Sequence, residues 1–87
     1  MDEKQTTIEQ VTRVKERHEQ ELLRLANVVG VGVGFRHKHG QLTDEVALVV
    51  NVSQKKSVLE LSQKDIIPTE LEGIPVDVQE VGHIRAL

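Results

Sequence analysis

The segment between residues 27 and 35 alternates valine with glycine and ends at Phe35. Successive side chains of an extended chain point to opposite faces, so one face of this segment is branched and apolar and the other is bare. The apolar face consists of Val29, Val31, Val33 and Phe35. The bare face consists of Gly30, Gly32 and Gly34. The pattern predicts a strand with its valine face in a core and its glycine face open to solvent or to a close neighbour.

The size and composition of the chain limit what can surround this strand. The chain has 87 residues, which indicates one domain over residues 1–87, with residues 1–5 and 83–87 as flexible tails. Phe35 is the only aromatic residue and cysteine is absent. Base-stacking surfaces for nucleic acid are therefore disfavoured, and disulfides and cysteine zinc sites are excluded. The core must consist of Val, Leu and Ile.

Residues 6–26 have the periodicity of an amphipathic helix. Apolar residues recur at spacings of three and four, with His18 at the boundary of the apolar stripe. Thr6 and Glu9 fit a capping box at the start of the helix. Asn27 tolerates a left-handed backbone and is suited to ending it.

Two further strands follow the glycine strand. A polar loop over residues 36–44 leads to a strand over residues 45–52, in which Ala47 belongs to the face with smaller side chains. Residues 57–66 indicate one or two short helical turns. A third strand covers residues 74–81, and its Pro75 favours an edge position or an outward-facing proline.

These elements predict an α+β fold, a two-layer sandwich. The long N-terminal helix and the short helix pack on one face of a three-stranded, mainly antiparallel sheet. The order along the chain is helix, strand, strand, short helix, strand. We expect the glycine strand in the centre of the sheet and the other two strands at its edges.

Several segments also resemble a known bacterial module when they are read in order. They are residues 23–35, 43–52, the lysine pair at 55–56, the Ile-Pro pair at 67–68, and residues 73–82. Together they resemble an N-terminal module that precedes trypsin-like serine peptidase domains in bacterial proteins of unassigned function. The resemblance covers residues 22–82 and implies a peptidase-associated or pro-region-like domain.

The chain does not carry the peptidase chemistry itself. Ser53, Ser57 and Ser62 lie in polar connections without a nucleophile signature around them. The carboxylates are scattered, and no acid, base and nucleophile cluster together, so we expect no enzyme activity and no cofactor. The glycine spacing is wrong for a dinucleotide fingerprint and leads to a hairpin instead of a helix.

His37 and His39 are the candidate metal ligands, because residues two apart share a face of an extended segment. Two ligands do not make a stable zinc site, and the intervening Lys38 opposes cation binding. We therefore expect no metal site and treat the pair as an exposed loop.

Two functions of different classes remain. The first is a protein-interaction module that binds a protein partner or a second copy of itself, either through the bare sheet face or through an exposed sheet edge. Its candidate binding residues are Gly30, Gly32, Gly34, Ala47 and Asp77. The alternative is a small-molecule-binding or sensor domain with a pocket between helix and sheet. The polar N-terminus and the lack of a long apolar run favour a cytoplasmic protein that binds neither membrane nor nucleic acid.

Overall fold

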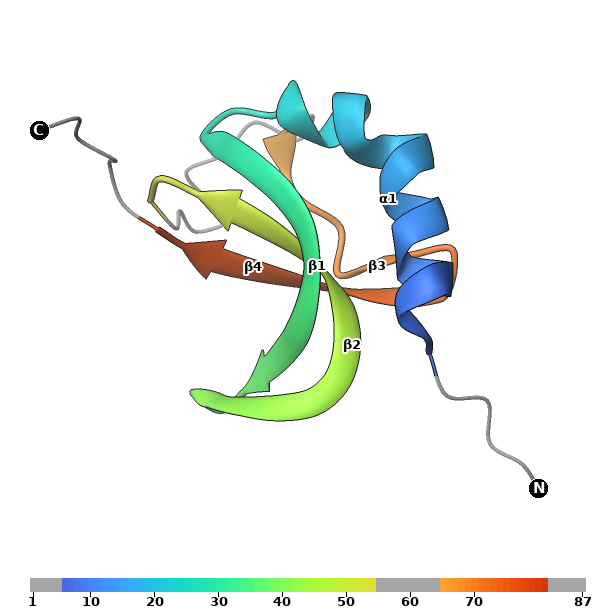
Figure 1. The fold of residues 1–87 in the computed structure, drawn as a ribbon. Helices are drawn as coiled ribbons and strands as arrows, with labels where there is room; N and C mark the ends of the chain where they lie inside the picture. The colour runs from blue at the N-terminus through green and yellow to red at the C-terminus, as the bar shows by residue number, and fades with distance from the viewer. Residues whose placement is uncertain (1–5, 55–64, 82–87) are drawn as a thin grey trace, which may run out of the picture.

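The computed structural model describes residues 6–54 and 65–81. Within these ranges the fold is α+β, with one helix and a four-stranded mixed sheet in the order β1-β2-β4-β3. The elements are α1 (Ile8–Leu23), β1 (Val28–Lys38), β2 (Gln41–Val52), β3 (Glu70–Leu71) and β4 (Ile74–Glu80). β1 and β2 form an antiparallel hairpin, β4 runs parallel to β2, and β3 pairs antiparallel with β4. The α+β prediction is confirmed, but the sheet has four strands and is mixed, whereas three mainly antiparallel strands were predicted (Figure 1).

The predicted strand order is wrong. β2 and β4 occupy the interior of the sheet, and the glycine strand β1 lies at an edge. The short strand β3 was not predicted, and the predicted helical turns over residues 57–66 fall mainly on residues 55–64, outside the described ranges. The predicted tails at 1–5 and 83–87 also lie outside them.

Pro75 is accommodated without an edge position. The Val76 N–H donates to the Thr69 carbonyl at 3.0 Å, away from β2, so the Pro75 nitrogen faces β2. Pairing between β2 and β4 begins only at Leu48 and Val76. The missing N–H of Pro75 therefore falls just before the first paired residue, and no ladder bond is lost.

α1 is shorter than predicted at both ends. Its capping box is formed by Thr7 and Gln10, not by Thr6 and Glu9: the Thr7 hydroxyl accepts from the Gln10 N–H and the Gln10 side chain accepts from the Thr7 N–H. The helix ends at Leu23 with Arg24 as its C-cap. Asn27 has the expected left-handed backbone, φ 75°, but beyond the helix, where its side chain bonds to Ser53 and Gln54 at the end of β2.

A two-residue turn joins β1 to β2, in place of the predicted nine-residue loop. His39 and Gly40 both have positive φ, 52° and 79°, as the tight hairpin turn requires. Glu72 and Gly73 make the same kind of turn between β3 and β4, with φ 51° and 79°. Glutamate is unusual at a left-handed position, whereas histidine is among the residues found there more often.

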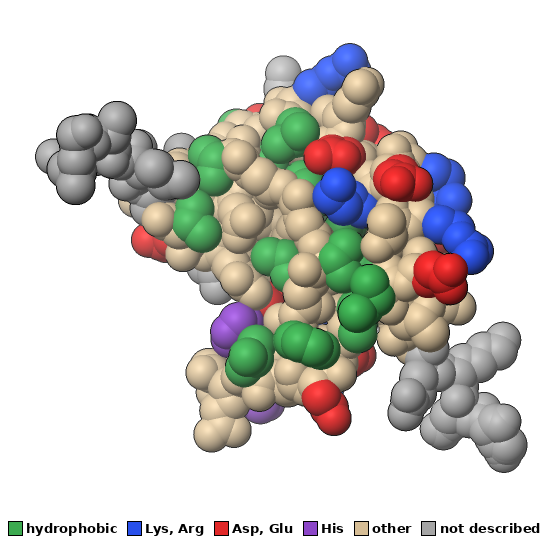
Figure 2. All heavy atoms as spheres, viewed as in Figure 1, with side chains coloured by type: hydrophobic (Ala, Val, Ile, Leu, Met, Phe, Trp, Pro, Cys, Tyr) green, Lys and Arg blue, Asp and Glu red, His purple; other side chains and the backbone are tan. Residues whose placement is uncertain are grey.

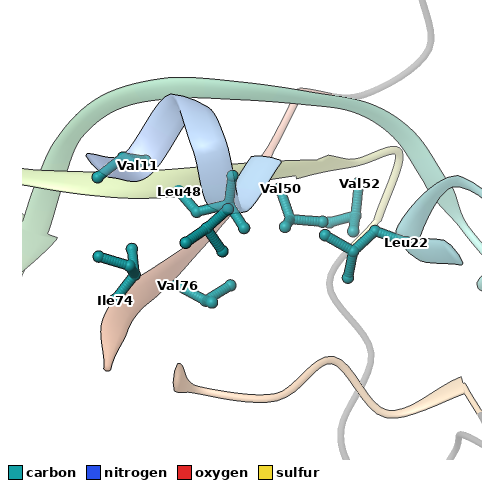
Figure 3. Packing of buried hydrophobic residues seen from close by; sticks show 8 residues of the cluster. Val11, Leu22, Leu48, Val50, Val52, Ile74 and Val76 are labelled. Atoms are coloured by element: carbon teal, nitrogen blue, oxygen red, sulfur yellow. The ribbon is translucent and has the colours of Figure 1, made fainter. Parts of the chain in front are cut away.

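The hydrophobic core lies between α1 and one face of the sheet. It is built from buried side chains of the helix and of the two interior strands, shown in Figure 3. These are Val11, Val14, Leu22, Leu48, Val50, Val52, Ile74 and Val76. Val31 and Val33 of β1 pack against this cluster, as the alternation predicted.

Val29 does not follow the predicted alternation. The pairing register shifts between Val28 and Gly30, so Val28 takes the core-side position and Val29 becomes the extra residue of a β-bulge. Val29 is 53% exposed. A bulge changes the side on which one residue lies, and no alternation pattern reveals where it occurs.

Gly32 and Gly34 of β1 have different surroundings. A Cβ added at Gly34 would lie 3.0 Å from Val49 Cγ2, whereas one at Gly32 would meet nothing within 4 Å. We expect Gly34→Ala to be less stable than Gly32→Ala by about 1 kcal/mol, because only the first forces Val49 to move. Urea unfolding of the two variants checks this. Equal stability would mean that Val49 yields without cost.

Candidate functional site

The candidate binding residues are brought together on the face of the sheet opposite α1. Gly32 pairs with Val49 and Val49 with Asp77, while Gly34 pairs with Ala47, and paired residues of neighbouring strands share a face. This face is not bare, however. Ala47 is 0% exposed and Val49 is 8% exposed. This face is therefore covered at β2, whereas the space beside Gly32 of β1 is open.

The end of the β1–β2 hairpin reaches the same face, where it contacts β4. In Figure 1 both strands are bowed and their hairpin end swings away from α1. His37, near the end of β1, reaches Asp77 of β4: its backbone N–H lies 3.1 Å and its Nδ1 3.2 Å from Asp77 Oδ2. β1 thus crosses over β2 to contact a strand with which it does not pair.

Asp77 is the acceptor on which this contact depends. Its Oδ2 also accepts from Gln79 Nε2 at 2.9 Å, and its side chain is 13% exposed. Burial raises the pKa of the Asp77 carboxyl, but the hydrogen bonds from Gln79 and His37 outweigh it, so the pKa is lowered overall. His37 Nδ1 also lies 3.1 Å from Gln79 Nε2, so the side chains of His37, Asp77 and Gln79 form one cluster. The Asp77 carboxylate, which accepts from the His37 backbone N–H, holds the hairpin end against β4. Sequence reasoning singled out both residues but had no signal for this contact across forty positions.

His39 lies near this contact but does not complete a metal site. His37, His39, Asp77 and Gln79 line an open groove of about 460 Å³. Within residues 6–54 and 65–81, no three metal-ligating side chains come together to hold an ion. His39 belongs to the tight turn, so the two histidines do not follow one another along a regular extended segment, as the sequence argument assumed.

A second polar cluster joins α1 to the β3–β4 turn. Glu72 accepts from Arg17 Nε at 3.0 Å and lies 2.8 Å from His18 Nε2, while His18 Nδ1 lies 3.1 Å from Glu21. A histidine with a carboxylate at each ring nitrogen is fully bonded only as the imidazolium. Hydrogen bonds to Glu72 and Glu21 accordingly raise the pKa of His18. Hydrogen bonds from Arg17 and His18 lower the pKa of Glu72 to about 2.

This cluster predicts a pH optimum of stability. Because the pKa of His18 is raised in the folded state, its imidazolium contributes fully to stability below pH 6.5, the ordinary pKa of histidine. This contribution is lost as the pH rises through the folded-state pKa. Because the pKa of Glu72 is lowered, its carboxylate contributes fully to stability above pH 4.5. This contribution is lost as the pH falls towards about 2. We expect the difference in melting temperature between wild type and Glu72→Gln to be largest between these two values.

Thermal unfolding from pH 3 to pH 9 measures this difference. Glu70→Gln is the matched control, because Glu70 is an exposed carboxylate on the adjoining strand β3. Its difference curve should be flat in the same window. A Glu72→Gln curve as flat as that of the control would contradict the role given to the cluster.

The outer edge of β1 is the remaining feature, and its polarity follows from one hydrogen bond. The Val81 N–H donates to the Val52 carbonyl at 2.8 Å, so the backbone groups of Val52 face β4. Backbone groups alternate sides along a strand, so those of Val49 and Ala47 face β1. The backbone N–H and C=O groups of their partners Gly32 and Gly34 therefore point towards β2.

The residues between the glycines consequently face outward. Val31, Val33 and Phe35 pair with β2 residues whose backbone groups point to β4, so their own N–H and C=O groups point away from β2. No other strand of the described chain pairs with this edge. Figure 2 shows hydrophobic side chains scattered over this side of the molecule. Phe35 remains 46% exposed, although it shares the helix-side face with Val33.

This edge therefore offers a second candidate beside the glycines: the backbone groups of Val31, Val33 and Phe35, with which no strand of the described residues pairs. Alternation identified which side chains point inward, but only the strand order reveals which backbone groups face outward. One signal was present in the sequence: residues 28–35 contain no charged residue and no proline, the usual protections of an edge strand.

Comparison with known proteins corrects the sequence-based resemblance. The model of the NARROW LEAF 1 N-terminal domain family matches residues 3–81. This family is not a bacterial peptidase-associated module, and its name points to a plant-derived domain, so both the bacterial and the peptidase assignments are wrong. No curated protein matches the chain. In the described residues, α1 falls short of the length and apolar character needed to cross a membrane.

Proposed function

The chain belongs to the NARROW LEAF 1 N-terminal domain family, and we propose that it is a non-catalytic protein-interaction module that adds a strand of another protein molecule to the outer edge of β1. The observation that carries this proposal is the row of outward-facing backbone groups at Val31, Val33 and Phe35. Such a row is a template for strand addition, in which main-chain hydrogen bonds supply affinity.

Side chains at this edge support strand addition over other modes of binding. Val31 and Val33 are only half-buried against the core cluster, and Phe35 is exposed beyond it. An added strand would place its own side chains beside these three and extend the apolar helix-side face. The opposite face is less suited, because Ala47 and Val49 are already buried there.

The proposal assigns structural roles to the two clusters that contain histidine. His18 bonds to Glu21 and Glu72, and His37 bonds to Asp77, so each stabilises a contact between distant elements. No nucleophile is needed for either role. A cytoplasmic location, without contact to nucleic acid or membrane, remains part of the proposal and can be tested by cell fractionation.

A displayed library of linear peptides, panned on the purified domain, tests the proposal. We expect selected peptides to shift the amide resonances of Val31, Val33 and Phe35 and to lose binding to Val33→Pro. Proline removes an outward-facing N–H while leaving the bonds of Gly32 and Gly34 to β2 in place. Peptides whose shifts map to the groove at His37 instead would favour the small-molecule or sensor alternative and overturn the proposal.

A further inference from the structure

We propose that the strand added to β1 is β1 of a second copy of this chain, so that two sheets join into one around a two-fold axis at Val33. This inference rests on the proposed function and identifies its partner. It follows from three properties of the edge: the spacing of its outward-facing groups, the side chains beside them, and the absence of charge along it.

The spacing of the outward-facing groups fixes the register. In an antiparallel pair, residues whose backbone groups face each other exchange two hydrogen bonds. With the axis at Val33, Val33 pairs with Val33 of the second copy and Val31 pairs with Phe35 of the second copy. By symmetry, Phe35 also pairs with Val31 of the second copy. This register uses the outward-facing N–H and C=O groups of all three residues in each copy, whereas an axis at Gly32 would pair Phe35 with the bulged Val29.

The side chains beside these groups are complementary to their own symmetry mates. Val31, Val33 and Phe35 share the helix-side face, since they pair with Val50, Leu48 and Val46. The proposed register therefore sets Phe35 against Val31 of the second copy, on both sides of the central valine pair. An aromatic residue beside a β-branched one is a favourable cross-strand pair. The only aromatic residue of the chain, 46% exposed in one copy, becomes covered.

Neither charge nor the position of α1 opposes the pairing of the two β1 strands. Residues 28–35 are uncharged, so no like charges face each other across it. Arg36 would lie beside Gly30 of the second copy, which has no side chain to obstruct it. The middle of α1 is held towards the opposite edge of the sheet by the bonds of Arg17 and His18 to Glu72. The helix therefore leaves Phe35 uncovered.

Sedimentation velocity over a concentration series tests the inference with the whole chain. We expect a monomer–dimer equilibrium for wild type, and a dissociation constant raised at least about tenfold in Val33→Pro, which loses main-chain hydrogen bonds. Phe35→Lys, at a half-exposed position, should weaken the dimer similarly, with its circular dichroism spectrum unchanged. Leu42→Lys is the matched control: Leu42 is 63% exposed near the same hairpin end but lies on β2, away from the joint.

The outcomes separate this inference from the proposed function. A wild-type chain that stays monomeric up to millimolar concentration, while library peptides still bind at β1, would overturn the two-fold dimer and leave strand addition intact. A monomer that binds no such peptide would overturn both. A dimer weakened by Leu42→Lys but unaffected by Phe35→Lys would place the interface elsewhere and contradict the proposed register.

Discussion

Leu48→Ala is expected to lower the free energy of unfolding by about 3 kcal/mol, the largest effect of any single truncation considered for this fold. Leu48 is 0% exposed and lies on the interior strand β2, between Val33 of β1 and Val76 of β4. Its removal leaves a cavity that three strands and α1 surround. Rigid strands on both sides cannot close on such a cavity, so the transfer and cavity terms both apply.

Chemical unfolding of Leu48→Ala and Leu42→Ala measures this effect. Leu42 lies on the same strand but is 63% exposed, so its truncation should cost less than about 0.5 kcal/mol. The pair separates burial from the intrinsic preference of leucine for a strand. A loss below about 1 kcal/mol at Leu48 would mean that the helix does not cover this position.

Asp77→Ala is expected to lower the free energy of unfolding by about 2 kcal/mol, because two donors lose their partly buried, charged acceptor at once. They are the His37 backbone N–H and Gln79 Nε2, and His37 Nδ1 also loses a polar neighbour at 3.2 Å. The lowered pKa of Asp77 means that the charged form is the one that stabilises the fold. This stability is present above the unfolded-state pKa and is lost as the pH falls through the folded-state pKa.

Unfolding curves at pH 7 and pH 3 test both statements. Asp77→Ala should be less stable than wild type at pH 7, with a smaller difference at pH 3. Asp44→Ala, which removes an exposed carboxylate of β2, is the control and should change little at either pH. An equal loss for Asp77→Ala at both pH values would show that the carboxylate charge does not hold the hairpin end.

Much of the layer architecture could be predicted from the sequence, because it depends on local periodicity. The spacing of Val11, Val14 and Leu22 identified α1, and alternation placed Val31 and Val33 towards the core. A helix with one apolar stripe and strands with one bulkier face can bury these surfaces only against each other.

The arrangement of the strands could not be predicted in this way. Alternation shows which side chains point inward but not which strands are neighbours, so placing the glycine strand centrally was a guess that topology overturned. The bulge at Val29 depends on pairing with β2, and the contact of His37 with Asp77 depends on how strongly the hairpin is bowed. These are properties of long-range pairing.

The candidate site was therefore only partly visible in the sequence. The sequence pattern singles out the glycine strand by its missing side chains, but it does not show the directions of its backbone groups. The pairing shows that the backbone groups of Gly32 and Gly34 point towards β2. The outward-facing groups belong to Val31, Val33 and Phe35, which alternate with the glycines. Function at an edge strand depends on this distinction, which requires knowing the neighbour of every strand.

Amide hydrogen exchange of β1, followed by NMR at two protein concentrations, tests this distinction most directly. We expect the amides of Gly32 and Gly34 to exchange slowly at both concentrations. Those of Val31, Val33 and Phe35 should exchange rapidly in dilute solution and more slowly when the protein is concentrated. Slow exchange of these three amides at every concentration, together with rapid exchange of the two glycine amides, would contradict the orientation of β1 on which the proposed interaction depends.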